Sequence, residues 1–385
     1  MRAFYFASVL MLTLAAGSAS PALAQTPAAA LVRTDNRQRT ALDATVHQAA
    51  TAYMQQPAAV GLSIGIYQGG KQAFYNYGEV EKGTGRLPTA TTLYDIGSVA
   101  KTFVGTLLAQ AVLDKKAQLT DDIRRYLPGQ YPNLEFAGHP VRLIDLANHT
   151  ASLPGTSHVY PKALGDSLRA LPLPQRIAYY NRYSADSLLA DLHQLRPTAQ
   201  PGTTYRYNNL GPLILQLLLE RIYQQPYEQL ITRYVQQHFG LRDTKRVFSA
   251  AEQRRYATGY DEQQRPQTHT NYTGYWGGTT LASTPADLLR YAQANLAERD
   301  PAVRLAHQPT TTLPTGYAVG LVWRLDTDAA GRPRIYHSGH SPGFNTWVAL
   351  YPDQNVAIVL TVNDTISQDR LAALGEALVP ARAAQ

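Results

Sequence analysis

The sequence predicts an α/β protein of the α+β type: an antiparallel sheet built from the two ends of the chain and flanked by helices, plus a mainly helical lobe. Strand-like runs lie near both ends, whereas about two hundred residues between them are dominated by helical spacing. The 385 residues are 44% hydrophobic and 16% charged. This is enough apolar material for a core larger than that of one small domain.

The N-terminal residues are expected to be removed from the mature protein. Residues 1–24 start with a basic residue, continue with an apolar run and end in Ala-Leu-Ala, the pattern of a cleavable secretory signal peptide. We therefore predict cleavage after Ala24, a flexible leader over residues 25–40, and a single domain over residues 41–385. The mature protein is expected to be secreted or periplasmic.

The sheet is predicted from five short segments that follow a first helix over residues 41–55. Two strand-like runs flank a Gln-Gly-Gly-Lys sequence, which is typical of a β-hairpin. Strand-like runs return only near the C-terminus, so the simplest packing joins both ends in one antiparallel sheet. The predicted strands are 60–67, 72–77, 335–338, 347–351 and 356–362.

Helical spacing in the middle of the chain predicts the second lobe, approximately residues 100–330. A cleft between this lobe and the sheet is the natural place for a site. Residues 155–202, rich in Pro and Tyr, are interpreted as a cap or loop region with short helices. The predicted helices are 101–113, 143–148, 186–195, 210–224, 229–237 and 285–296.

Composition excludes several classes of function. The chain has no cysteine, so thiol catalysis and zinc thiolate sites are excluded. The formal charge of +7 is spread along the sequence rather than clustered, so we expect no nucleic-acid partner. No stretch after the signal peptide has about 18 apolar residues, so no transmembrane anchor is predicted. No metal-ligand spacing and no glycine-rich phosphate loop occurs, so we expect no metal and no cofactor.

The first candidate catalytic element lies in residues 94–103. A turn of small residues precedes Ser98 and an apolar helix follows it. A helix start offers unpaired backbone N–H groups and a dipole that favours a developing oxyanion. Lys101 lies three residues on, on the same face, and is placed to take the proton of the hydroxyl. Taken alone, the pattern also fits an N-cap serine with a solvated lysine.

A second candidate element lies in residues 201–211. A turn leads through Tyr207 and Asn209 into an apolar helix. A phenol and an amide two residues apart can face the same cleft from a loop. Taken alone, the segment also fits the entry of a helix with a capping residue.

The third candidate element lies at the end of a predicted strand, where His337, Ser338, Gly339 and His340 follow one another. The glycine permits a close approach of the backbone to a ligand. Taken alone, His337 also fits a hydrogen-bonded histidine of a strand.

Together, these segments resemble the serine β-lactamase and penicillin-binding protein family, in particular its class C β-lactamase-like branch of carboxypeptidases, D-aminopeptidases and esterases. Ser98-Val-Ala-Lys101 matches the S-x-x-K element. Tyr207-Asn-Asn209 matches Y-x-N, and residues 337–339 match the H-x-G form of the third element. Supporting similarity extends over nearly the whole mature chain. The resemblance implies the β-lactamase/transpeptidase-like fold and a serine hydrolase.

The resemblance also implies roles for the catalytic residues. Ser98 would attack a substrate carbonyl and form an acyl-enzyme, while Lys101 and Tyr207 would accept and relay its proton. Water would then release the acyl group, with Tyr207 as the base. Which of Lys101 and Tyr207 is the base in acylation stays open.

The remaining site residues are implied to bind the substrate. The backbone N–H groups of the nucleophilic serine and of His340 would form the oxyanion hole, next to Ser338 and Gly339. Asn209 would orient the chain of the substrate. His337 would hydrogen-bond Tyr207 or a carboxylate of the substrate.

The substrate class is predicted from the third element. Histidine at position 337 stands where the efficient β-lactamases of this branch carry lysine, and an imidazole that is largely neutral at pH 7 anchors a carboxylate less firmly. We therefore predict a small-molecule or peptide substrate that is an ester or a D-amino-acid-containing peptide or amide. The alternatives are a class C-type β-lactamase, and, from another class, a penicillin-binding receptor without turnover or a catalytically inactive binding protein.

Aromatic residues are candidates for lining the cleft against a hydrophobic acyl group, although core packing would equally explain the two tryptophans. They are Tyr205, Trp276, Trp323 and Phe344.

Overall fold

The computed structural model describes residues 32–154, 166–168, 170–267, 269, 272, 274–275 and 280–380. From Val32 onward the chain belongs to one compact unit. The predicted signal peptide over residues 1–24 lies outside the described residues, as does the beginning of the predicted cap region at residues 155–165.

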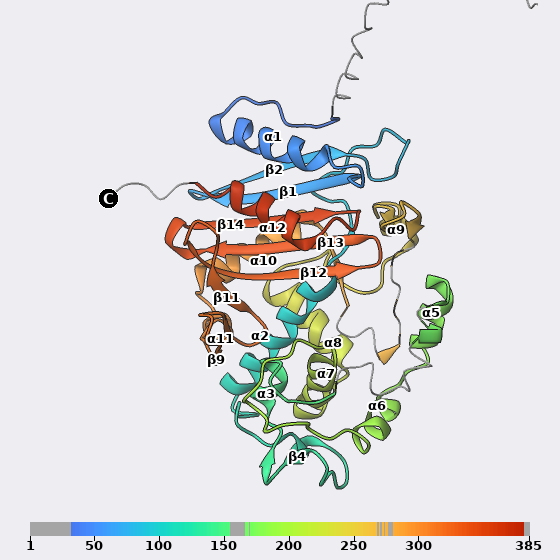
Figure 1. Ribbon diagram of the computed structural model, residues 1–385, viewed down its shortest axis with the longest axis vertical. Helices are drawn as coiled ribbons and strands as arrows, with labels where there is room; N and C mark the ends of the chain where they lie inside the picture. The colour runs from blue at the N-terminus through green and yellow to red at the C-terminus, as the bar shows by residue number, and fades with distance from the viewer. Residues whose placement is uncertain are drawn as a thin grey trace, which may run out of the picture. The chain divides into compact units, whose positions relative to one another are not determined.

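An eight-stranded antiparallel sheet carries the fold, in the order β2-β1-β14-β13-β12-β11-β10-β9 (Figure 1). The two ends of the chain meet in its middle, where β1 pairs with β14. The predicted fold class and its antiparallel sheet are therefore confirmed. The strands are β1 (Gly61–Gln68), β2 (Lys71–Gly78), β9 (Thr311–Thr312), β10 (Ala318–Val319), β11 (Arg324–Thr327), β12 (Pro333–Ser341), β13 (Phe344–Tyr351) and β14 (Val356–Val362).

The sheet is larger than the sequence predicts, because β9, β10 and β11 extend it. Their residues, 311–327, were assigned to the helical lobe. Two of these strands have only two residues and the third has four. Such short segments carry almost no periodicity of their own, and their hydrogen-bonded neighbours decide that they are strands.

Opposite faces of the sheet pack against different helices, as the alternation of side chains requires. Leu62 and Ile64 of β1 lie in the same apolar cluster as residues of α1 (Ala41–Met54) and α12 (Gln368–Ala377). Gly65 points to the other face, where a methyl group added to it would lie 3.5 Å from Leu289 of α10 (Pro285–Ala297). Figure 1 shows α12 over β13 and β14, and α1 next to β2 and β1.

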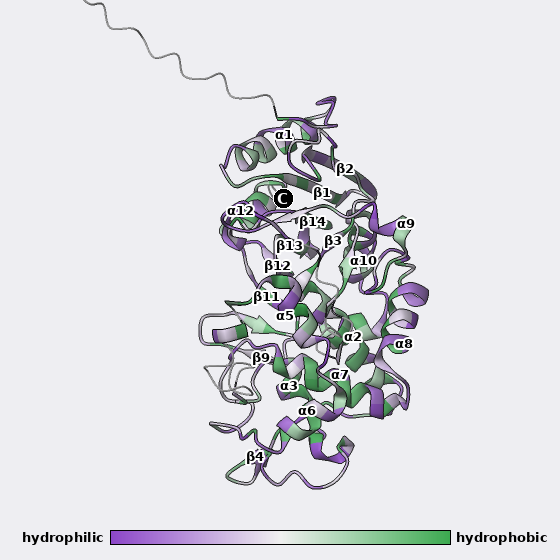
Figure 2. Ribbon diagram, turned by 90° about the vertical axis from the view of Figure 1, so that its right-hand side faces the viewer, coloured by the Kyte–Doolittle hydropathy of each residue, from purple (hydrophilic) through white to green (hydrophobic). Residues whose placement is uncertain are grey.

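Two long apolar helices form the centre of the helical half, α2 (Ala100–Leu113) and α7 (Leu210–Tyr223), and most of their residues are buried. Figure 2 shows their strongly hydrophobic colouring. The helices around them are α3 (Leu143–Ala147), α5 (Leu173–Tyr180), α6 (Ala185–Leu192), α8 (Tyr227–Thr232), α9 (Ala250–Gln253) and α11 (Pro301–Ala306). Of these, α3, α6 and α8 overlap predicted helical ranges, α5 lies in the region expected to contain short helices, and α9 and α11 are not predicted.

Two local features differ from the sequence-based expectation. The helix predicted over residues 229–237 is α8 followed by a π-helix over Arg233–His238. The segment from Val32 to Thr40, which the sequence assigns to a flexible leader, is packed on β2. Thr34 forms an isolated bridge with Tyr77, and Asn36 Nδ2 donates to the Tyr77 hydroxyl at 2.8 Å.

Within the described residues, no helix has both the length and the apolar character needed to cross a membrane.

Candidate active site

The strongest chemical feature of the structure is the pair Ser98 and Lys101. Ser98 lies in a 3₁₀ turn, Gly97–Val99, that runs directly into α2. Lys101 is only 5% exposed, and its Nζ donates a hydrogen bond to Ser98 Oγ at 2.7 Å. The three-residue spacing places both side chains on one face of the turn. A serine oxygen with an amine at this distance is the arrangement that nucleophilic catalysis requires.

This pair opens into a cavity of about 190 Å³. Of the residues predicted for the site, Asn209 and His340 also line it, together with Leu213 of α7 and Tyr272. Tyr207, His337, Ser338 and Gly339 do not line it. The structure therefore gathers the three predicted segments at one place but puts only some of their side chains at the cavity wall. The full lining is Asp95, Gly97, Ser98, Lys101, Asn209, Leu213, Tyr272, Thr280, Leu281, His340, Ser341 and Pro342.

The backbone of β12 lies directly against the turn that carries Ser98. A methyl group added at Gly339 would be 2.0 Å from the Ile96 carbonyl oxygen and 3.2 Å from Ser98 N. From the other side, Gly97 has φ +50° and a methyl group on it would be 2.5 Å from His340 N. Only glycines allow this approach. The two backbone segments assigned by resemblance to the oxyanion hole, at Ser98 and His340, are thus neighbours.

Tyr207 lies behind Lys101, between several polar side chains. Its ring centroid is 5.7 Å from Lys101 Nζ and 5.1 Å from Cζ of Arg324. On another side it packs against the ring of His149, with the centroids 4.5 Å apart. The Tyr207 hydroxyl is buried and has no hydrogen-bond partner among the described residues. The proton relay from Lys101 to Tyr207 is therefore not a formed hydrogen bond in this structure.

Asn208 and Asn209 have different roles at the start of α7. Asn208 Oδ1 accepts the backbone N–H of Gly211 at 2.9 Å and so caps the first turn. Asn209 occupies the N-cap position but makes no capping hydrogen bond with its side chain, which is exposed at the cavity. The amide of Asn209 is consequently available to a ligand, whereas that of Asn208 is structural.

The position of His337 corrects its expected role. The side chain is fully buried, its Nδ1 lies 2.7 Å from the Ser338 carbonyl oxygen, and its Nε2 has no partner among the described residues. Its ring centroid is 6.4 Å from that of Tyr207, and no hydrogen bond joins the two. Burial, and then the charges of Arg324 and Lys101, hold the pKa of His337 well below its usual range. A neutral, enclosed imidazole cannot take hold of a substrate carboxylate.

A partly buried cation that the sequence analysis does not identify, Arg324, lies close to Tyr207 but does not line the catalytic cavity. It lies on β11 opposite Tyr336 of β12, and its Nη1 is 3.4 Å from Ser338 Oγ. Its Nε is buried without a hydrogen-bond partner among the described residues. No motif marks the residue in the sequence. The one feature that could indicate its role is its place at the start of β11, the strand that pairs with β12.

His149 packs against Tyr207, with the ring centroids 4.5 Å apart. It is 2% exposed and has φ +58°, and its Nδ1 lies 3.5 Å from the backbone N of Asn208. Burial, with the charges of Lys101 and Arg324, lowers the pKa of His149 to about 3. His149 is therefore a neutral residue that positions Tyr207 by packing against its ring.

Two buried acids near the site have structural partners. Asp145 is 1% exposed, and its carboxylate pairs with Arg142 at 2.9 Å and caps α3. Asp95 lines the cavity floor and accepts a hydrogen bond from the Tyr256 hydroxyl at 3.3 Å. Among the described residues, no group of three His, Asp or Glu side chains is arranged to hold a metal ion.

The aromatic lining differs from the one expected. Trp323 and Phe344 are fully buried in apolar clusters, so they belong to the core and not to the cleft. Tyr205 is half-buried beside His149, and Trp276 lies outside the described residues. Tyr272, which the sequence analysis did not single out, lines the catalytic cavity instead.

Comparison with known proteins is consistent with this geometry. The beta-lactamase family profile matches residues 46–380. A beta-lactamase of Lysobacter lactamgenus is 27% identical over 373 residues, covering 86% of this chain and 89% of the relative. The D-alanyl-D-alanine-carboxypeptidase/endopeptidase AmpH of Escherichia coli (strain K12) is 25% identical over 331 residues, 79% of each chain. The chain belongs to the beta-lactamase family, and it is a serine hydrolase.

Solved structures show the same fold. A beta-lactamase/D-alanine carboxypeptidase from Pseudomonas syringae superposes with a TM-score of 0.73, at 23% identity, over 88% of this chain and 98% of the other. A class C beta-lactamase superposes with the same TM-score over 88% of this chain and 95% of the other, at 22% identity. The predicted β-lactamase/transpeptidase-like fold is confirmed.

Proposed function

We propose that this protein is an exported hydrolase that cleaves D-amino-acid-containing peptides or esters through an acyl-enzyme on Ser98. The observation that carries the proposal is the 2.7 Å hydrogen bond between Lys101 Nζ and Ser98 Oγ at the wall of a cavity. Export rests on the signal-peptide pattern of residues 1–24. The substrate is a small molecule or a peptide.

The acylation step follows from the position of Lys101. In its neutral form the amine accepts the Ser98 proton as Oγ attacks the substrate carbonyl, and the new C–O bond forms while the carbonyl oxygen becomes an oxyanion. The backbone N–H groups of Ser98 and His340 stabilise that oxyanion. Collapse of the intermediate expels the leaving amine or alcohol, which receives the proton from Lys101, directly or through Tyr207.

The deacylation step reverses the same chemistry with water. A base next to the ester takes a proton from water, the oxygen adds to the acyl carbon, and Ser98 leaves with the proton. We assign Tyr207 as this base, supported by the proximity of its ring centroid to Lys101 Nζ, at 5.7 Å, and to Arg324 Cζ, at 5.1 Å. Asn209, exposed at the cavity, hydrogen-bonds the amide of the acyl chain.

The preference for a substrate with a terminal carboxylate is supported by Arg324 and Ser338. These two side chains lie 3.4 Å apart on adjacent strands, beside the residues of β12 that line the catalytic cavity but not in its lining, and the Arg324 Nε has no hydrogen-bond partner among the described residues. A guanidinium beside a hydroxyl matches a carboxylate. This arrangement would hold the C-terminal carboxylate of a D-alanyl-D-alanine peptide, the substrate that the name of the Escherichia coli relative specifies.

A second candidate function is a β-lactamase, because the curated relative at 27% identity carries that name. The burial and neutrality of His337 favour the peptidase or esterase over it. Ring-opened penicillin attached to Ser98 is a serine ester like the peptide acyl-enzyme, but its leaving amine stays bonded to the adduct. The two functions therefore differ in how quickly water releases the adduct.

The test combines intact mass spectrometry with product analysis on mature wild-type protein and on Ser98→Ala. Each protein is incubated with a penicillin and, separately, with acetyl-L-lysyl-D-alanyl-D-alanine, while free drug and released D-alanine are followed. We expect released D-alanine and a slowly decaying penicillin adduct from the wild type only, with both proteins folded by circular dichroism.

Other outcomes identify the alternatives. Rapid drug hydrolysis would favour the β-lactamase. A stable adduct without peptide cleavage would indicate a penicillin-binding receptor. Turnover by Ser98→Ala would remove the nucleophile assignment altogether, and failure of every peptide, ester and drug to react with the wild type would favour an inactive binding protein.

A further inference from the structure

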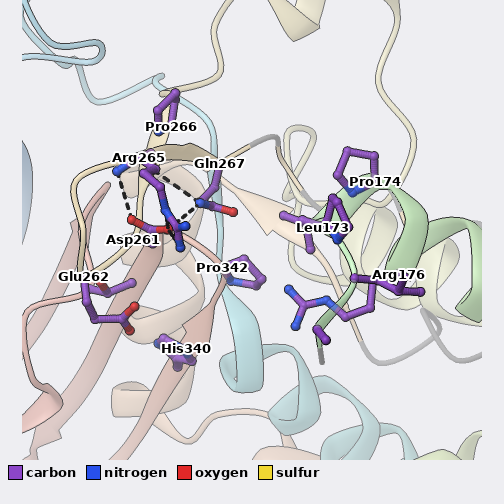
Figure 3. Close-up of a pocket in the computed structure, with 15 residues that line it drawn as sticks. Leu173, Pro174, Arg176, Asp261, Glu262, Arg265, Pro266, Gln267, His340 and Pro342 are labelled. Carbon is purple, nitrogen blue, oxygen red and sulfur yellow. Dashed lines mark hydrogen bonds and ion pairs between the residues drawn. The ribbon is translucent and has the colours of Figure 1, made fainter. Parts of the chain in front are cut away.

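The structure contains a second, larger cavity that adjoins the catalytic one. It measures about 770 Å³ and shares His340 and Pro342 with the catalytic cavity. Its other walls are formed by residues 170–176, which lead into α5, and by residues 261–267 (Figure 3). A group bound at Ser98 can thus extend past His340 into this space.

The position of the second cavity relative to Ser98 places it on the acyl side of a bound substrate. The carbonyl carbon attacked by Ser98 carries two substituents that point away from each other. The Arg324 and Ser338 side would take the carboxylate of the leaving group, so the other substituent, the acyl chain, runs along the end of β12. There it meets His340, Pro342 and then the second cavity.

One positively charged side chain of this cavity, Arg176, has no partner among the described residues. Arg176 extends from α5 with its guanidinium directed into the cavity toward Pro342 (Figure 3). Its Nε is buried and makes no hydrogen bond, and Arg176 forms no ion pair among the described residues. A buried guanidinium N–H without an acceptor is unfavourable, whereas a carboxylate can accept from Nε and one Nη at once.

The other charges of the cavity are accounted for. Arg265 is paired with Asp261 at 2.8 Å, and Gln267 Nε2 donates to the same carboxylate at 2.9 Å, so this group is locally neutral. Glu262 is exposed on the wall formed by residues 261–267. It disfavours an anion at its own end of the cavity. The attraction for an anion is therefore localised at Arg176.

The charge of Arg176 also acts on the catalytic cavity. Burial raises the pKa of Tyr272 to about 12, and the charge of Arg176 opposes that rise. Tyr272 lines the catalytic cavity, which places Arg176 within electrostatic reach of a bound acyl group.

We propose that the second cavity is an acyl-side subsite for peptides that carry a carboxylate on the acyl portion, and that Arg176 is the residue that determines this specificity. The proposal rests on the peptidase function proposed above. The catalytic pair acts on any acyl group that fits, and Arg176 selects among acyl groups.

The test uses matched substrates that differ in one functional group. In acetyl-L-lysyl-D-alanyl-D-alanine, the lysine Nε carries either a succinyl group, which ends in a carboxylate, or the corresponding succinamide. A shorter pair, acetyl-L-glutamyl- and acetyl-L-glutaminyl-D-alanyl-D-alanine, covers a shorter reach. We expect the wild type to prefer the carboxylate member of at least one pair about tenfold to a hundredfold in kcat/KM.

Three variants complete the experiment. Arg176→Gln should remove the preference and leave the rate with the amide substrates unchanged, and Arg176→Lys should restore part of it. Glu262→Gln, on the opposite wall, is the matched control and should retain or increase the preference. Dissociation constants of the same peptides for Ser98→Ala and for Ser98→Ala/Arg176→Gln should show the same difference without turnover.

The outcomes separate the two proposals. If the wild type cleaves both members of each pair equally, or if Arg176→Gln keeps the preference, the subsite is refuted while the peptidase function stands. If the wild type cleaves no member of either pair, the peptidase function fails and this inference fails with it. Equal loss on carboxylate and amide substrates in Arg176→Gln would show that Arg176 only supports α5.

Discussion

The active site joins a helix wall, formed by the Ser98 turn and α2, to a strand wall, formed by β11 and β12, and the two are built in different ways. On the helix wall, Ser98 and Lys101 are neighbours in one turn and already joined by a hydrogen bond. On the strand wall, His337 is buried and neutral, and the positive charge comes from Arg324 on the next strand. The nucleophile is thus assembled locally, whereas the charge that we propose for binding a substrate carboxylate depends on strand pairing. The following predictions test this division, beginning with the largest expected effect.

Removing the Lys101 amine should impair the nucleophile on the helix wall without changing the residues of the strand wall. Lys101→Ala should slow acylation of Ser98 about a thousandfold, because a serine hydroxyl is a weak nucleophile without a base. The acylation rate is measured by intact mass spectrometry with a penicillin or an activated ester. Lys115→Ala, an exposed position beyond the same helix, is the control. A nearly normal rate in Lys101→Ala would make Tyr207 the acylation base.

The second-largest loss of activity is expected from a substitution that pushes β12 away from the turn that carries Ser98. In Gly339→Ala the new methyl group would meet the Ile96 carbonyl oxygen at 2.0 Å, so the backbone of β12 must move away from Ser98. Loss of one oxyanion donor lowers kcat by about a hundredfold or more. Gly65→Ala, whose methyl group would make ordinary contacts at 3.4 Å or more in the same sheet, should keep its activity.

Thermal unfolding of both variants distinguishes a lost oxyanion hole from a lost fold. Full activity in Gly339→Ala would mean that the β12 backbone does not hold the oxyanion.

Removing the cation of the strand wall should change specificity more than chemistry. Arg324→Gln should lower kcat/KM for a peptide with a free C-terminal carboxylate about tenfold to a hundredfold, because a charge-assisted hydrogen bond is lost. Hydrolysis of the corresponding C-terminal methyl ester should change little, and Arg324→Lys should recover part of the loss. An equal loss on both substrates would show that Arg324 acts by positioning Tyr207.

The smallest expected effect concerns pH and stability rather than turnover. The pKa of His149 is lowered to about 3 in the folded protein, so below pH 6.5 the unfolded chain binds a proton that the folded chain does not. Stability therefore falls as the pH falls from 6.5 toward 3, by about 1.4 kcal/mol per pH unit for this group. Asparagine tolerates the left-handed backbone at this position, so His149→Asn is the suitable variant.

The measurement is the free energy of unfolding by urea at pH 7 and at pH 5. The decrease between the two values should be about 2 kcal/mol smaller in His149→Asn than in the wild type. His139→Asn, at an exposed position, is the control for the loss of a histidine. An unchanged decrease in His149→Asn would mean that the buried imidazole does not contribute to acid sensitivity.

The fold could be predicted wherever a segment carries its own periodicity. The hairpin β1–β2, the long helices α2 and α7 and the terminal strands have apolar residues at the right spacing and were placed within a few residues. The strands β9 to β11 could not be found, because segments of two to four residues are strands only through their partners. The packing of Val32 to Thr40 was missed because it depends on side chains such as Tyr77.

The site shows the same limit. Asn209 was expected to face a ligand, and it does lie at the cavity, because its neighbour Asn208 takes over the capping of α7. Phe344 and Trp323 were expected near the cleft as aromatic residues, but packing buries them in the core. Tyr272 and Arg176 line the cavities from segments without a recognisable motif.

The sequence by itself determined the serine and lysine pair, because two residues three positions apart in a helical turn meet whatever the rest of the chain does. It also determined the family, since the three motifs occur in order over the whole chain. Only the tertiary structure decided that His337 is enclosed and neutral, that Arg324 supplies the charge, and that a second cavity adjoins the first. Burial and strand register arise from contacts between distant segments, and no local pattern encodes them.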